Sequence, residues 1–149
     1  MICNIVDVLS AALTPLIAAL AIYIAYQQWR TNHLRYMHES YDRRFEIYKV
    51  VQIHLSYIFQ YAKVNEDELH VLLDALQKSR FLIGIEMHEY INTIYKHSLK
   101  VSMYKSQLEG VPVGGKRNEL VEKEHKELAW LIDQLPILAD KFDPYLSLR

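Results

Sequence analysis

The chain contains a long run without charged side chains near its start. Between Asp7 and Arg30 every residue is uncharged, and residues 8–29 (VLSAALTPLIAALAIYIAYQQW) form a mainly apolar stretch of 22 residues. A helix needs roughly 20 apolar residues to cross the hydrocarbon core of a bilayer. A cleaved signal peptide would begin with basic residues, whereas this chain begins MICNIVD. The pattern therefore predicts an uncleaved transmembrane anchor in residues 1–29.

Aromatic and basic residues mark the far edge of this predicted span. Tyr23, Tyr26 and Trp29 lie at the edge, where amphipathic rings favour the headgroup layer. Arg30 follows them, and no Lys or Arg precedes the span. The positive-inside rule then places the N-terminus outside and residues 30–149 in the cytoplasm. We expect a single-pass protein of the bacterial inner membrane.

Small residues share one side of the predicted span. On a helix of about 3.6 residues per turn, one face collects the small and hydroxyl-bearing side chains Ser10, Thr14, Ala18, Ala21 and Ala25. Membrane helices associate through close approach at small residues and through hydroxyl hydrogen bonds. The stripe therefore predicts either a seam between packed helices or, in a ring of copies, the lining of a pore.

Downstream of the span the apolar positions change to a repeating pattern. Alternating steps of three and four residues connect positions 34, 37, 41, 44, 48, 51, 55, 58 and 62. Such heptads predict a helix packed against other helices, and the absence of Gly and Pro between residues 16 and 83 lets it continue from the span. We expect Tyr41, Phe45 and Tyr48 in the core of a bundle. Arg44 occupies the same face and is expected to pair with an acidic residue, because an unpaired buried cation is costly.

Three more helices are predicted after this one. Asn65, followed by three acidic residues, is a typical N-cap for a second helix that returns antiparallel. A break is expected around residues 80–84, and a third helix should then reach about residue 109. Residues 110–118 (GVPVGGKRN) hold three of the four glycines and predict a loop.

The last predicted helix begins at Glu119. Pro136 should kink it, and Pro144 should end it shortly before the end of the chain. The predicted fold is all-α: an N-terminal transmembrane helix (residues 1–29) continuing into a cytoplasmic antiparallel helical bundle (residues 30–149).

Composition removes several classes of protein from consideration. The 17 basic residues almost balance the 18 acidic ones, so we expect no direct binding to nucleic acid. Cys3 is the single cysteine of the sequence and can form neither an internal disulfide nor a cysteine-based zinc site. We interpret it as an unpaired terminal thiol.

The histidines match no catalytic or metal-binding motif. His88 and Glu89 begin like a zinc-protease motif, but position 92 is Asn where the second His would stand. Helical ribonucleases of prokaryotic defence place a His after an Arg at a shorter spacing than the seven residues that separate Arg80 from His88. We therefore expect no catalytic residue, no metal site, no cofactor and no enzymatic activity.

Four sequence elements carry a resemblance to a known family. They are IAYQQWRTN (24–32), YDRRFEIY (41–48), FLIGIE (81–86) and KFDPYL (141–146). Together they resemble a group of small single-span bacterial membrane proteins with a YQQWRTN juncture and a DRRF element. The architecture is also similar to the accessory membrane pore protein of type VI-B CRISPR systems. That resemblance implies assembly into a ring, a membrane pore and a part in RNA-guided antiphage defence.

Two functions remain open on the sequence alone. In the first, several copies form a ring-shaped pore that depolarises or permeabilises the inner membrane during defence. In the second, a membrane-tethered helical adaptor recruits a cytoplasmic partner and conducts nothing. The expected partners are membrane lipid, other copies of the same chain and a cytoplasmic defence effector.

Overall fold

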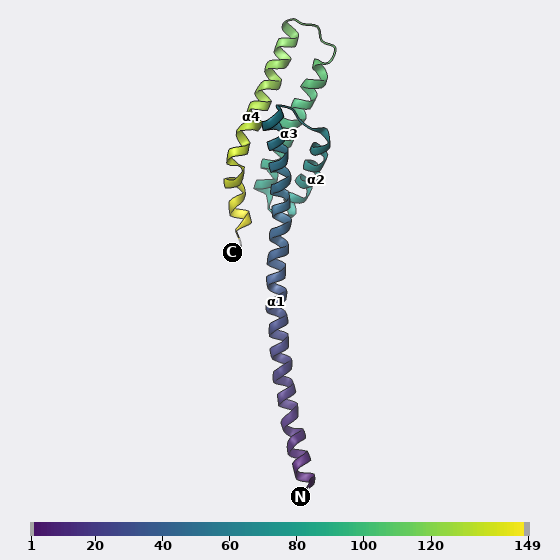
Figure 1. The fold of residues 1–149 in the computed structure, drawn as a ribbon, viewed down its shortest axis with the longest axis vertical. Coiled ribbons are helices and arrows are strands. Elements are labelled where there is room, and N and C mark those ends of the chain that lie inside the picture. Colours follow the sequence, from purple (N-terminus) through teal and green to yellow (C-terminus); the bar gives the residue numbers. More distant parts are fainter. Residues whose placement is uncertain (1, 148–149) are drawn as a thin grey trace. The chain divides into compact units, whose positions relative to one another are not determined.

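The protein is an all-α four-helix bundle. The computed structural model describes the backbone of residues 2–147 and the side chains of residues 13 and 15–147. The helices are α1 (Ile2–Tyr61), α2 (Glu66–Leu82), α3 (Ile85–Leu108) and α4 (Gly115–Leu146) (Figure 1). The predicted all-helical class is confirmed, and no strand occurs within residues 2–147.

The chain divides into two compact units, Met1–Glu39 and Ser40–Arg149. The N-terminal unit holds the first part of α1, whose described side chains from residue 15 to residue 36 are all exposed. Across the part of the chain that the structure describes, no helix has both the length and the apolar character that a membrane crossing requires. Residues 8–12 and 14 of the predicted span lie outside the residues whose side chains are described.

The C-terminal unit buries one apolar core between its helices. α3 packs along both α4 and α2, and Figure 1 shows α3 and α4 as an antiparallel pair joined by a loop. Side chains spaced three and four residues apart supply the core from every helix, which is the pattern of an amphipathic helix. The fully buried apolar members are Val51, Leu55, Ile58, Leu72, Ile91, Ile94, Leu131 and Phe142.

The heptad face of α1 is confirmed in one half and wrong in the other. Val51, Leu55 and Ile58 are buried as predicted. Upstream, Ile47 occupies the core, whereas Phe45 is 36% exposed and is therefore not a core residue. The physical reason is that consecutive residues of a helix are separated by about 100°, so Phe45 points well to the side of the face that Ile47 and Val51 share, and the Tyr41 and Tyr48 rings lie between the two directions.

The other two predicted aromatic core residues lie at this edge. Tyr41 and Tyr48 are half-buried, and Tyr48 packs against the core from its side. The heptad spacing therefore identified the correct helix and its general face, and it misplaced the centre of that face before residue 51.

The predicted helix ends agree in part with the structure. The Asn65 side chain accepts a hydrogen bond of 3.0 Å from the backbone N–H of Asp67, which confirms the N-cap. α2 ends at Leu82, inside the predicted break, and Gly84 has a φ of 124°, a conformation that side chains with a Cβ rarely adopt. α4 begins at Gly115, four residues before the predicted start, and continues two residues past Pro144.

Candidate functional site

Three of the sequence elements that carry the resemblance meet at one end of the C-terminal unit. Arg44 Nε donates a hydrogen bond of 3.0 Å to the main-chain oxygen of Leu82, and Arg44 Nη1 donates one of 3.2 Å to the main-chain oxygen of Tyr145. Both acceptors lie in the last turns of helices, whose carbonyls have no partner within their own helix. A cation is also favoured there by the helix dipole. Arg44 thus joins α1 to the ends of α2 and α4.

The expectation that Arg44 pairs with an acidic residue is wrong. Two carbonyls hold the guanidinium instead, because its forked donors fit the oxygens of two converging helix ends. The nearby carboxylate of Glu86 accepts a hydrogen bond of 3.2 Å from the Tyr145 hydroxyl. Burial, this hydrogen bond and the charge of Glu86 raise the pKa of Tyr145. We call Arg44, Leu82, Glu86 and Tyr145 the Arg44 junction.

A row of aromatic rings runs from the surface of α1 into the core beside this junction. Ring centroids lie 5.8 Å apart between Tyr41 and Phe45, and 5.7 Å apart between Phe45 and Tyr48. Tyr48 meets the edge of the buried Phe142 ring at 5.3 Å. The Lys49 ammonium lies 6.0 Å from the centre of Phe45 on the outer side. Phe45 is therefore held by its neighbours while part of its ring stays exposed.

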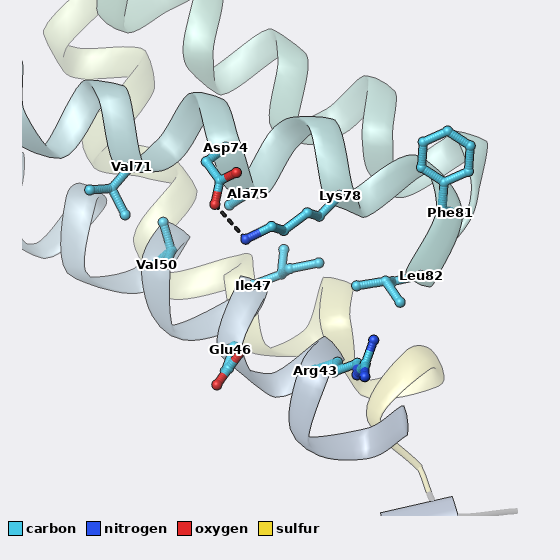
Figure 2. A pocket seen from close by; sticks show the side chains of 10 residues that line it. All are labelled: Arg43, Glu46, Ile47, Val50, Val71, Asp74, Ala75, Lys78, Phe81 and Leu82. Carbon is cyan, nitrogen blue, oxygen red and sulfur yellow. Dashed lines mark hydrogen bonds and ion pairs between the residues drawn. The ribbon is translucent and has the colours of Figure 1, made fainter. Parts of the chain in front are cut away.

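A groove opens between α1 and α2 next to the junction (Figure 2). Its volume is about 460 Å³. Its lining residues are Arg43, Glu46, Ile47 and Val50 from α1 and Val71, Asp74, Ala75, Lys78, Phe81 and Leu82 from α2. We call this feature the α1/α2 groove.

The α1/α2 groove has an apolar floor and charged rims. Figure 2 shows Lys78 bonded to Asp74 along the α2 rim, and their side chains lie 2.6 Å apart. Phe81 stands at one end of the groove and is 87% exposed, which is unusual for a side chain of this size. A mixed surface of this kind is suited to binding a protein surface and offers no nucleophile with an activating base.

One histidine that the sequence did not single out lies inside the core. His54 is 1% exposed, and its Nε2 lies 2.8 Å from the Ser98 hydroxyl. The Ser98 hydroxyl is also placed to donate a hydrogen bond of 3.0 Å to the main-chain oxygen of Ile94, an arrangement that the Nε2-protonated tautomer of His54 satisfies. His54 Nδ1 is buried without a hydrogen-bond partner. Burial lowers the pKa of His54 to about 4.

His97 connects α3 to α4. His97 Nδ1 pairs with the Glu127 carboxylate, which also accepts a hydrogen bond from Lys100, and the His97 ring stacks on Trp130. These contacts tie α3 to α4. Among the described residues, no group of three His, Cys, Asp or Glu side chains could hold a metal ion. Sequence spacing could not reveal these pairs, because their members are about thirty residues apart.

His88 ties the start of α3 to the end of α2. Its Nδ1 lies 3.0 Å from the main-chain oxygen of Leu76 and 3.2 Å from the Ser79 hydroxyl. These contacts fasten α3 to the C-terminal half of α2.

The residues predicted for the membrane segment lie in the N-terminal unit. Ala18, Ala21 and Ala25 are exposed on α1, whereas Ser10 and Thr14 lie outside the residues whose side chains are described. The stripe can therefore be followed over its second half alone.

The predicted membrane-interface residues make short-range contacts along α1. Gln27 donates a hydrogen bond of 3.0 Å to the Tyr23 hydroxyl, and the Tyr26 and Trp29 rings lie 6.2 Å apart. Arg30 follows them and is exposed. These groups occupy two consecutive turns of α1.

Comparison with known proteins found no family model, no curated protein and no solved structure that matches this chain.

Proposed function

We propose that the protein is an oligomeric protein of the bacterial inner membrane, anchored by residues 8–29. Its N-terminus would lie outside, and the C-terminal unit would lie in the cytoplasm. The observation that carries this proposal is the exposure of large apolar side chains all around α1 in the N-terminal unit. They include Leu13, Leu16, Ile17, Leu20, Ile22, Tyr23, Ile24, Tyr26 and Trp29, each at least half exposed.

Such exposure requires a covering environment. A helix that is apolar on every side is stable inside a protein core or inside lipid. An α-helix can cross hydrocarbon because its backbone hydrogen bonds are satisfied within the helix. The aromatic group around Trp29 and the cation of Arg30 stand where the apolar surface ends, as expected for the inner edge of a span.

The finer proposal is that several copies form a ring that conducts. In such a ring each span would give one face to its neighbours, one to lipid and one to a water-filled lumen. The small side chains at Ala18, Ala21 and Ala25, with Ser10 and Thr14 before them, suit either the seam or the lumen. Opening would depolarise or permeabilise the inner membrane, which is the antiphage action that the sequence resemblance implies.

Three measurements on the full chain test these statements in sequence. Membrane fractionation should place the protein in the inner membrane, and mass measurement in mild detergent should show an assembly larger than a dimer. Reconstituted vesicles containing the assembly should then lose an ion gradient. Release of the wild-type protein by a salt or alkaline wash would overturn the anchor. Intact gradients with a dense, assembled protein and its activating partner present would overturn the pore.

The second candidate function is a membrane-tethered adaptor. The α1/α2 groove favours it, because an apolar floor with an 87% exposed Phe81 at its end could receive an amphipathic helix from a cytoplasmic partner. A monomeric membrane protein that carries no current would select this function over the pore.

A further inference from the structure

We propose that the C-terminal unit binds an organic cation, of the guanidinium or alkylammonium type, in a pocket where the end of α1 meets the start of α2. The volume of this pocket is about 400 Å³, which is within the range of small-molecule sites. Tyr57 and Tyr61 from α1 and Glu68 from α2 line it. We call this feature the Glu68 pocket. The inference goes beyond the proposed function and does not depend on it, because the whole lining belongs to the C-terminal unit.

The turn between α1 and α2 brings the lining residues together. α1 ends at Tyr61, and α2 begins at Glu66 after a short connection. Glu68 is in the first turn of α2 and therefore lies beside the last turns of α1. Ile53, Tyr57 and Tyr61 follow one another at intervals of four residues, so they share one face of α1. The pocket is thus formed by two rigid helices rather than by a loop.

The charge of the lining is suited to a positive ligand. Among the described residues that line the pocket, Glu68 alone is charged. Its Oε2 atom is buried and has no hydrogen-bond partner in the described part of the chain. Burial raises the pKa of this carboxyl, because the ionised form loses contact with water. Buried charges are normally paired, and a cation bound at the other oxygen of this carboxylate would supply the missing partner.

Two tyrosine rings provide a surface on which positive charge is favourable. The centroids of the Tyr57 and Tyr61 rings lie 4.8 Å apart, and their planes are inclined by 45°. A cation over an aromatic face is attracted by the negative potential of the ring. The Lys63 ammonium lies 5.7 Å from the centre of Tyr61, so this ring already attracts a cation of the chain itself. Tyr61 is 53% exposed and is therefore open to a ligand as well.

The rest of the lining favours an organic cation over a metal ion. Hard metal ions need several oxygen ligands, of which carboxylates are the strongest, and this pocket offers one carboxylate beside aromatic and apolar groups. Gln52, Ser56 and Gln60 are exposed along the pocket, and their side-chain oxygens can accept hydrogen bonds from N–H groups. A guanidinium has five such donors and a planar face that stacks on aromatic rings.

Ligand-observed NMR with the full chain in mild detergent tests the choice of ligand. Saturation should pass from the protein to n-butylguanidinium, with a dissociation constant on the order of 1 mM. The uncharged n-butylurea has nearly the same shape and should receive little. Equal saturation of the two compounds would overturn the proposal, because it would show binding through apolar contact alone.

A capped tripeptide with one central arginine identifies the source of the cation. Tighter binding of this peptide than of n-butylguanidinium would assign the pocket to an arginine of a partner protein. Equal or weaker binding would assign it to a free small molecule. Both results support a cation site, and a protein that binds neither compound contradicts it.

Substitutions test the assigned residues. Glu68→Gln should weaken n-butylguanidinium binding by roughly tenfold. Glu66→Gln removes the same charge from the same helix turn outside this pocket, and it should have little effect. Tyr61→Leu should also weaken binding, whereas Tyr61→Phe keeps the aromatic face and should retain it. Lys63→Ala should strengthen binding, since it removes a competing cation.

Thermal unfolding of the same variants distinguishes a ligand group from a structural one. A carboxylate without a partner does not stabilise the fold, so Glu68→Gln should unfold at the wild-type temperature or above it. A clearly lower unfolding temperature would show that Glu68 is already paired within the protein and would overturn its role. Equal affinities of the Glu66→Gln and Glu68→Gln variants for n-butylguanidinium would overturn it too.

Discussion

The two parts of α1 differ in where their apolar side chains lie. In the N-terminal unit they surround the helix, and Ile22 is 72% and Trp29 is 65% exposed. In the C-terminal unit one face of the helix is buried, and Val51 and Leu55 on it are fully covered, whereas Ile53 and Phe59 on other sides stay exposed. The first part of α1 therefore has an apolar surface that no other helix covers. The second part has an apolar face that α2, α3 and α4 cover. The comparison separates apolar side chains that fold the C-terminal unit from apolar side chains that no other helix covers.

The largest expected effect on stability comes from a substitution in the buried core of the C-terminal unit. Phe142→Ala removes a fully buried ring from the core, where it meets the edge of Tyr48. We expect a loss of about 3 to 5 kcal/mol in the free energy of unfolding of the C-terminal unit. Denaturant unfolding followed by circular dichroism measures it. A loss of only about 0.5 kcal/mol, which is typical of substitutions at the surface, would mean that α4 does not pack on α1 in solution.

A change in the N-terminal unit should affect location rather than folding. Leu20→Arg places a charge in the middle of the predicted span, which costs about 2.5 to 3.5 kcal/mol at the centre of a membrane helix. The variant should move partly out of the membrane fraction, whereas Leu20→Ala should stay. The unfolding of the C-terminal unit should match that of the wild type. Unchanged membrane recovery of the arginine variant would contradict a spanning helix.

The Arg44 junction stabilises the end of the bundle through two main-chain carbonyls. Arg44→Met keeps much of the side chain's bulk but leaves the oxygens of Leu82 and Tyr145 without this donor. We expect a loss of about 1 to 3 kcal/mol in unfolding free energy. Hydrogen exchange should increase in the last turns of α2 and α4. Lys126→Met, an exposed change of the same charge, is the control and should have little effect.

The buried His54 predicts a dependence of stability on pH. Its pKa is about 4 in the folded protein and 6.5 for an exposed ring, so between these values the unfolded chain binds a proton that the folded chain excludes. Stability from this group is complete above pH 6.5 and falls as the pH decreases toward 4. The slope should be at most about 1.4 kcal/mol per pH unit. His54→Leu should remove this component, and an identical slope in that variant would contradict the assignment.

The sequence allowed the helices to be predicted better than their tertiary contacts. The continuity of α1, the N-cap at Asn65 and the break before Gly84 follow from local chemistry, and each was found. The start of α4 was missed because the helix extends into residues that the glycines had assigned to a loop. Pro144 did not end α4, since packing of Phe142 and the contacts of Tyr145 hold the last turn.

The candidate site was less accessible from sequence. The elements of the Arg44 junction were recognised one by one, but their meeting was not, because Arg44 binds carbonyls 38 and 101 residues away. Every residue has a main-chain oxygen, so the sequence does not indicate which of these oxygens will accept a hydrogen bond from Arg44. The α1/α2 groove depends on the crossing of two helices, and no spacing along one helix encodes it.

The smallest expected effect distinguishes the edge of the bundle from its core. Phe45 is 36% exposed, so Phe45→Ala should cost the isolated chain about 0.5 to 1 kcal/mol of unfolding free energy, far less than Phe142→Ala. Denaturant unfolding of both variants under the same conditions measures the difference. A loss comparable to that of Phe142→Ala would show that Phe45 packs in the core, as expected from the sequence.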